Sequence, residues 1–226
     1  MRKLCLTIIL LIGFSKVLFA QFGNCTASEM QTYTDHETGN TITILTDTLK
    51  NDRFLYQTDP MWTSDGKYLL FRSSSRGNGE KIERTLPNGE KRSWTPTQIY
   101  FIEMATGQII QATEGPDLGS AFLANKSNRM FISRKEKEDW NLYVMNLDKF
   151  FADVKKGKVG KPAAYETLLG TFPTNMGRPG GYAIDCNDDY AYITVEREGT
   201  EEEKERMAKN AFLPESNQPV KIKPSL

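Results

Sequence analysis

Short apolar runs that alternate with turn signals recur along most of this chain. The clearest unit spans residues 60–72, where an aromatic residue precedes a Ser-Asp-Gly turn at residues 64–66 and an apolar run follows. Asp can hydrogen-bond its own backbone and Gly accepts a positive φ, so this tripeptide is typical of a tight turn. After a long polar insertion with its own Asn-Gly turn, residues 98–104 and 108–113 are predicted to form two further strands. Four strands in series predict one blade of a β-propeller.

The same unit recurs downstream, and such internal repetition decides the architecture of a chain. Trp62, Phe122 and Tyr182 hold matching places at equal intervals in the sequence. The second copy is predicted to place strands at residues 122–125, 129–132, 141–147 and 164–169, and the third at residues 182–185 and 190–195. Upstream, a Thr-Gly turn and the run that follows it resemble the fourth strand of a blade.

We therefore predict an all-β fold, a β-propeller of four-stranded antiparallel blades. The predicted units lie near residues 34–49, 58–115, 120–170 and 180–198, followed by a polar, charged tail over residues 199–226. The alternative is a β-sandwich whose hairpins resemble each other by chance. A closed ring needs typically four to eight blades, and the three to four blades expected here are incomplete. The chain is expected to be part of a longer protein, or to self-associate through open blade faces.

The N-terminus predicts export from the cytoplasm. Residues 1–20 have a basic start, an apolar run and a small residue before Gln21, which is the anatomy of a signal peptide. The mature protein is expected in the periplasm or outside the cell. There are 29 basic and 29 acidic residues, and this balance argues against a nucleic-acid partner and against a membrane partner after cleavage. An acidic oligosaccharide is still compatible with a local basic cleft.

Few residues suggest chemistry. His36 is the only histidine, so one chain cannot build a multi-histidine metal site, and a surface turn is the simpler interpretation of its position. Cys25 and Cys186 are the two cysteines of the mature chain, and export would permit a disulfide between them without predicting one. Guanidinium groups suit bidentate recognition of carboxylates. Arg53, Arg72 and Arg178 lie near predicted strand ends and are the candidate substrate-binding residues.

Residues 58–71 and 98–108 resemble the strand–turn–strand steps of oligogalacturonate lyases, polysaccharide lyase family 22, and of their TolB-like propeller relatives. The resemblance implies a seven-bladed ring that cleaves pectin fragments by β-elimination. It also implies a divalent metal, typically manganese, which acidifies the proton that a histidine base removes. In that family the ligands and the base belong to later blades. No catalytic residue, metal ligand or cofactor is therefore carried over onto this chain.

Three functions stay open at this point. The chain can be the N-terminal part of an exported oligogalacturonate-lyase-like propeller, inactive alone. It can be a non-catalytic TolB-like propeller that binds carbohydrate or protein. It can also be the propeller of an exported serine peptidase. Further histidines in later blades would favour the first function, and a Gly-x-Ser-x-Gly motif would favour the third.

Overall fold

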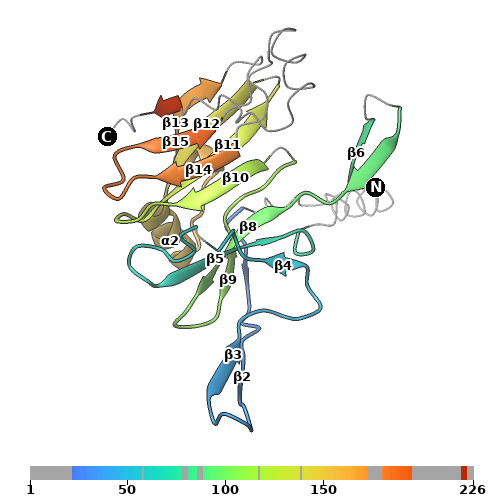
Figure 1. Ribbon diagram of the computed structural model, residues 1–226, viewed down its shortest axis with the longest axis vertical. Coiled ribbons are helices and arrows are strands. Elements are labelled where there is room, and N and C mark those ends of the chain that lie inside the picture. Colours follow the sequence, from blue (N-terminus) through green and yellow to red (C-terminus); the bar gives the residue numbers. More distant parts are fainter. Residues whose placement is uncertain are drawn as a thin grey trace, which may run out of the picture.

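A computed structural model describes residues 22–57, 59–77, 81–85, 89–116, 118–137, 139–172, 180–194 and 220–222. The described residues are mostly strands, arranged in several antiparallel sheets (Figure 1). The predicted signal peptide, Arg178 and most of the predicted tail lie outside them. No helix among the described residues is long and apolar enough to cross a membrane.

The first blade is a five-stranded sheet. Its strand order is β1-β9-β8-β5-β4. The strands are β4 (Asp52–Arg53), β5 (Tyr68–Ser73), β8 (Gln98–Glu103), β9 (Ile109–Gln111) and β1 (Cys25–Thr26). Trp62 extends the β4 edge through a single antiparallel bridge to Leu69. Strands β5, β8 and β9 match three strands of the predicted meander. The first strand predicted around Trp62 is reduced to the single bridge, β4 pairs with the end of β5 instead, and the N-terminal strand β1 adds an outer strand.

The second blade is a four-stranded meander in the order β10-β11-β12-β13. Its strands are β10 (Leu118–Leu123), β11 (Arg129–Glu136), β12 (Asp139–Asn146) and β13 (Glu166–Phe172). The residues predicted as strands of the second copy all lie in or beside these elements. This agreement confirms the all-β prediction and is consistent with an incomplete propeller-like fold.

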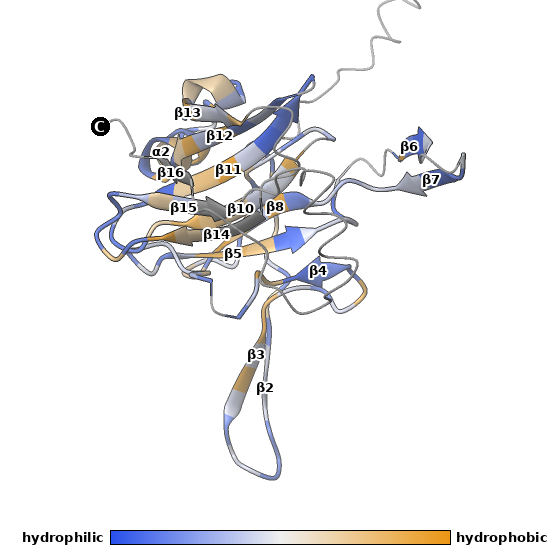
Figure 2. Cartoon of the chain, turned by 45° about the horizontal axis from the view of Figure 1, so that its top comes forward, coloured by the Kyte–Doolittle hydropathy of each residue, from blue (hydrophilic) through white to orange (hydrophobic). Residues whose placement is uncertain are grey.

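Three smaller elements complete the fold. A third sheet contains β14 (Gly180–Ile184), β15 (Ala191–Thr194) and β16 (Val220–Ile222). Strand β16 lies inside the segment predicted as a polar, charged tail. Two hairpins, β2 (Gln31–Thr34) with β3 (Thr41–Ile44) and β6 (Ile82–Thr85) with β7 (Lys91–Trp94), stand away from the sheets (Figures 1 and 2).

A helix that the sequence analysis did not predict lies between β12 and β13. Helix α2 (Leu147–Lys155) is capped by Asn146, whose side chain accepts a hydrogen bond from the Lys149 backbone. A short 3₁₀ turn, η1 (Pro162–Ala164), follows the helix. The buried helix residues Phe150 and Phe151 belong to the same core as Leu70 of the first blade. The Phe151 ring stacks on Tyr68, with 3.7 Å between the ring centroids. The helix therefore fills space between the two blades.

The turns that join the first two strands of each unit are connected to one another. Ser64 donates a hydrogen bond to Asn128 with 2.8 Å between the oxygens. The carboxylate of Asp188 accepts from the backbone of Asn125 and Lys126. We call residues 64–66, 125–128 and 187–188 the turn rim. It lies where β5 and β11 begin, so the ends of these strands define the opposite rim.

Candidate binding groove

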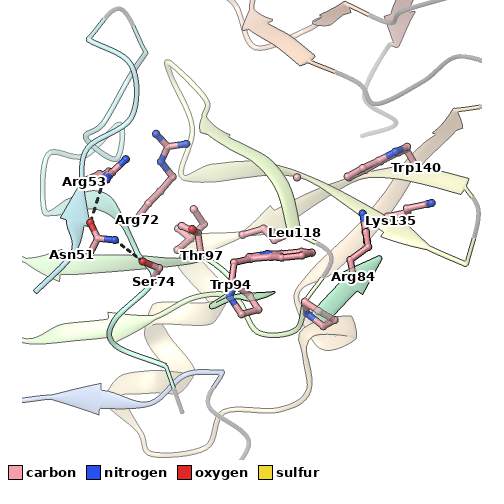
Figure 3. Close-up of a pocket in the computed structure, with 14 residues that line it drawn as sticks. Asn51, Arg53, Arg72, Ser74, Arg84, Trp94, Thr97, Leu118, Lys135 and Trp140 are labelled. Atoms are coloured by element: carbon pink, nitrogen blue, oxygen red, sulfur yellow. Dashed lines mark hydrogen bonds between the residues drawn. The ribbon is translucent and has the colours of Figure 1, made fainter. Parts of the chain in front are cut away.

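A groove of about 480 Å³ opens at the rim opposite the turn rim. Residues near the last positions of β5 and β11 line it, together with the β6–β7 hairpin and the first residues of β10 and β12 (Figure 3). A volume of this size falls in the usual range for small-molecule sites. The described lining contains no carboxylate. It contains two tryptophans and four cationic residues, which are Trp94, Trp140, Arg53, Arg72, Arg84 and Lys135.

Two of the three predicted binding residues meet in this groove. Arg53 on β4 and Arg72 on β5 are direct partners in the antiparallel register. Like charges placed directly opposite each other destabilise a sheet. Within the described part of the chain, neither guanidinium forms an ion pair with a carboxylate. A positive site without an internal counter-ion is suited to an anion from outside.

Short polar contacts orient these two arginines. Asn51 accepts a hydrogen bond from Nε of Arg53 at 3.3 Å and donates one to Ser74 at 2.7 Å (Figure 3). Arg72 donates from Nη2 to the backbone oxygen of Phe54 at 3.3 Å. Both guanidinium groups retain further N–H donors, because each carries five. Those donors can serve a ligand.

An ion-pair cluster beside β4 anchors the strand that carries Arg53. Arg76 forms two-pronged contacts with Asp52 and Glu29, with 2.6 Å from Nη2 to each carboxylate. Its side chain is only 6% exposed. Burial works to lower the pKa of Arg76, but the hydrogen bonds and charges of Glu29 and Asp52 outweigh it and raise that pKa. These contacts hold Asp52, and with it the start of the β4 backbone that continues into Arg53.

The β6–β7 hairpin supplies another wall of the groove. Trp94 ends β7 and is the partner of Ile82 in the register of the hairpin. The guanidinium of Arg84 lies over the Trp94 ring, 5.6 Å from its centroid. Figure 2 shows that this hairpin is largely hydrophilic and projects from the sheets. The position of Trp94 is therefore set by the hairpin and by Arg84.

The second blade supplies the far end of the groove. Lys135 on β11 and Trp140 on β12 are direct partners in the antiparallel register. Gly119 on β10 leaves room for the indole, because a Cβ at this position would lie 2.8 Å from Cζ3 of Trp140 and would also collide with Ser133. Lys135 is the second-last residue of β11 and lines the groove.

The remaining candidates from the sequence lie elsewhere. Arg178 is outside the described residues, so the structure does not place it. His36 is exposed in the β2–β3 turn, which Asp35 stabilises by accepting from the backbone N–H groups of Glu37 and Thr38. Cys25 and Cys186 are both free and exposed, and the structure does not join them.

Sequence reasoning missed Arg84, Trp94, Lys135 and Trp140. The Asn-Gly turn indicated a hairpin in the insertion, but nothing in its composition showed that the hairpin reaches the end of a blade. Trp140 carries no local signal either, because its role depends on Gly119 of β10, which is two strands away in the sheet.

The comparisons with known proteins agree with this fold. No family model and no curated protein matches the chain. One solved structure, an oligogalacturonate lyase in complex with manganese, superposes with a TM-score of 0.55 and 19% identity over 78% of this chain and 38% of that chain. The oligogalacturonate lyase from Vibrio parahaemolyticus superposes with a TM-score of 0.54 and 17% identity. This match covers 87% of this chain and 40% of the lyase chain.

These similarities define the class of protein first: the chain is an incomplete β-propeller. More particularly, its fold resembles that of the oligogalacturonate lyases, as residues 58–71 and 98–108 predicted. At these identities the shared property is the fold. The chain spans about two fifths of the length of the two lyases.

Proposed function

We propose that this chain provides substrate-binding blades of an exported, oligogalacturonate-lyase-like propeller that acts on acidic pectin fragments by β-elimination. The observation that carries the proposal is the placement of Arg53 directly opposite Arg72 at the edge of the groove. Galacturonate units carry one carboxylate each. A carboxylate bridging two guanidinium groups would gain charge-assisted hydrogen bonds and relieve the repulsion between them.

The groove chemistry supports an acidic sugar over a neutral one. Its described lining combines four cations with two tryptophans and no carboxylate. The arginines can pair with the carboxylates of an acidic sugar, and the tryptophan rings offer apolar faces to the sugar rings. The lyase-like fold gives independent support, because the two structural neighbours are oligogalacturonate lyases.

The described residues do not fit a manganese site. One lyase neighbour is a manganese complex. Among the residues that the structure describes, no three or more His, Cys, Asp or Glu side chains gather where they could hold a metal ion. We therefore assign no catalytic step to this chain. In the proposal, the metal and the base belong to other blades of a longer parent protein, and this chain alone is inactive.

Calorimetric titration of the full chain with trigalacturonate tests the binding proposal. We expect Arg53→Ala and Arg72→Ala each to weaken binding by roughly tenfold or more, the ratio that follows from losing a charged hydrogen bond. Arg92→Ala is the matched control, since Arg92 is an exposed arginine of β7 that pairs with Glu90. Maltotriose, a neutral trisaccharide, should not bind. Equal affinity for both sugars would overturn the proposal.

Activity and export are tested separately. The chain alone should give no manganese-stimulated rise in ultraviolet absorbance with oligogalacturonate, whereas a longer parent chain should give one. Binding without activity in the parent would leave a non-catalytic sugar-binding propeller. N-terminal sequencing of the exported protein should begin near Gln21, and an intact Met1 would contradict cleavage.

A further inference from the structure

A separate cavity lies beside β1 and β9 on the first blade. Its volume of about 360 Å³ falls within the usual range for small-molecule sites. Within the described part of the chain, it shares no lining residue with the groove. Ile99 of β8 lines the groove, whereas the next residue, Tyr100, lines this cavity. Because successive side chains of a strand point to opposite faces, the two sites lie on opposite faces of the first blade.

The hydroxyl of Tyr100 is buried without a protein partner. Tyr100 is only 3% exposed, and among the residues that the structure describes no group lies within hydrogen-bond distance of its hydroxyl. Buried polar groups are normally satisfied by protein or by a bound molecule, because leaving one unpaired costs free energy. Burial raises the pKa of Tyr100 to about 12, so the hydroxyl keeps its proton and can donate. The charge of Arg76, which also lines the cavity, acts on this hydroxyl, so the polar end of the ring lies on the cavity side.

The Arg76–Glu29 pair keeps one donor and one acceptor for a ligand. Of the five N–H donors of an arginine, Nε and both N–H groups of Nη2 contact carboxylates, and Nη1 donates once, to Oε1 of Glu29 at 2.9 Å. Among the described residues, the other N–H of Nη1 has no acceptor. Oε1 of Glu29 accepts only this bond, whereas Oε2 also accepts from the backbone of Asp47. A carboxylate oxygen can accept two hydrogen bonds, so Oε1 retains one position beside the free N–H.

The charges at the cavity favour a neutral ligand. Lys50 and Arg76 are positive, Glu29 lines the cavity with them, and Asp52 is bound to Arg76. These two positive and two negative groups cancel, and an anion would also meet the carboxylate of Glu29 directly. Phosphate and carboxylate oxygens without a proton can only accept hydrogen bonds, whereas a hydroxyl group both accepts and donates. A hydroxyl therefore matches the donor and acceptor of the Arg76–Glu29 pair.

We propose that this cavity binds a small neutral polyol, with one hydroxyl accepting from Tyr100 and a neighbouring hydroxyl bonded to both Arg76 and Glu29. Ile109 of β9 lines the cavity and offers an apolar contact to the carbon chain. The inference does not depend on the acidic-sugar groove, because the two sites have different lining residues and opposite ligand preferences. Both sites can be filled at the same time, since the first blade separates them.

A titration of the full chain with glycerol tests the proposal. Binding is followed by the backbone amide NMR signals of three residues that line the cavity, which should shift and saturate: Thr26, Ser75 and Gly77. Tyr100→Phe keeps the ring and removes only the hydroxyl, so it should weaken glycerol binding by roughly fivefold, the effect of one lost hydrogen bond. Tyr143→Phe is the matched control, because Tyr143 lies on the second blade and donates its hydroxyl to Glu136. Its affinity for glycerol should stay within about twofold of the unmodified chain.

Four outcomes would overturn the inference. Signals that do not saturate with glycerol would mean that only water occupies the cavity. Shifts of the same signals with inorganic phosphate and not with glycerol would make the cavity an anion site. Unchanged affinity in Tyr100→Phe would remove the hydroxyl from the site, and shifts confined to Thr97 and Gly119 would place glycerol in the groove. None of these results bears on the proposed function, which is tested with trigalacturonate and the variants of Arg53 and Arg72.

Discussion

The backbone N–H of Asn125 donates a hydrogen bond to Oδ1 of Asp188 across the boundary between the second blade and the third sheet, with 2.6 Å between the atoms. Lys126 and Ser127 donate to the other oxygen of the same carboxylate. Asp188 is buried and has a positive φ of 62°. A buried carboxylate is retained only where such partners compensate its lost hydration. This contact therefore joins neighbouring units.

We expect Asp188→Asn to lower the free energy of unfolding by about 1–3 kcal/mol, because the amide leaves some of these backbone donors without an acceptor. The measurement is urea unfolding followed by circular dichroism. Asp189→Asn is the control, since Asp189 is the exposed neighbour in the same turn. Equal losses in the two variants would show that Asp188 does not join the sheets.

Phe151→Ala should destabilise the fold more strongly. The Phe151 ring stacks on the Tyr68 ring. It also meets the Phe101 ring edge-on, with 5.1 Å between the Phe151 and Phe101 centroids. Truncating a buried Phe typically costs about 3–5 kcal/mol. We expect the loss in the same urea experiment, with both blades unfolding in one transition. Two separate transitions in the variant would mean that α2 couples the blades.

Arg72→Gln should change stability and binding in opposite directions. It removes one of two like charges that face each other across β4 and β5, so the free energy of unfolding should rise by about 0.2–1 kcal/mol. Affinity for trigalacturonate should fall, because a neutral glutamine cannot form the charge-assisted, two-pronged pair with a carboxylate. Thermal unfolding and calorimetric titration of one sample measure both. A loss of stability would show that Arg72 has a structural role.

The lowered pKa of Asp65 predicts that the protein loses stability in acid. Burial works to raise its pKa, but hydrogen bonds from Thr63 and Lys67 and the charge of Lys67 outweigh it and lower the pKa from 3.8 to about 2. The folded protein then binds fewer protons than the unfolded one, so stability falls as the pH drops from about 4 to about 2. Urea unfolding across this range should show a shallower decline in Asp65→Asn. An unchanged slope would contradict the assignment.

Tyr100→Phe tests a buried hydroxyl. Among the described residues, no protein group lies within hydrogen-bond distance of this hydroxyl, and burial raises the pKa of Tyr100 to about 12. Removing a buried polar group without a partner should leave stability unchanged or raise it by about 1 kcal/mol. A loss measured by urea unfolding would mean that a group bound in the adjoining 360 Å³ cavity satisfies the hydroxyl.

The sequence predicted the elements whose signals are local. The Ser-Asp-Gly turn and the apolar run after it correspond to the start of β5, where Gly66 has the positive φ that the turn requires. Arg53 and Arg72 were also found, because both lie at strand ends. Their pairing depends on register, which one sequence does not reveal when the partners are far apart.

Helix α2 was missed although its signal is present. Asn146 can cap a helix, and Leu147, Phe150, Phe151 and Val154 follow helical spacing. The repeat predicted only strands in the second unit, whereas this segment changes to a helical period. By contrast, strand β1 pairs with β9 from the other end of the blade. Such a distant pairing is selected by packing, so no local pattern could have predicted it.

The separation of the two rims has an evolutionary consequence. Contacts that join the units run through residues 64–66, 125–128 and 187–188, while the groove is built from the opposite ends of β5 and β11. A lineage can therefore exchange the groove side chains, or lengthen the β6–β7 hairpin, at little cost to the joints between the blades. This arrangement makes the rim with the groove the place where a change of ligand would disturb the fold least.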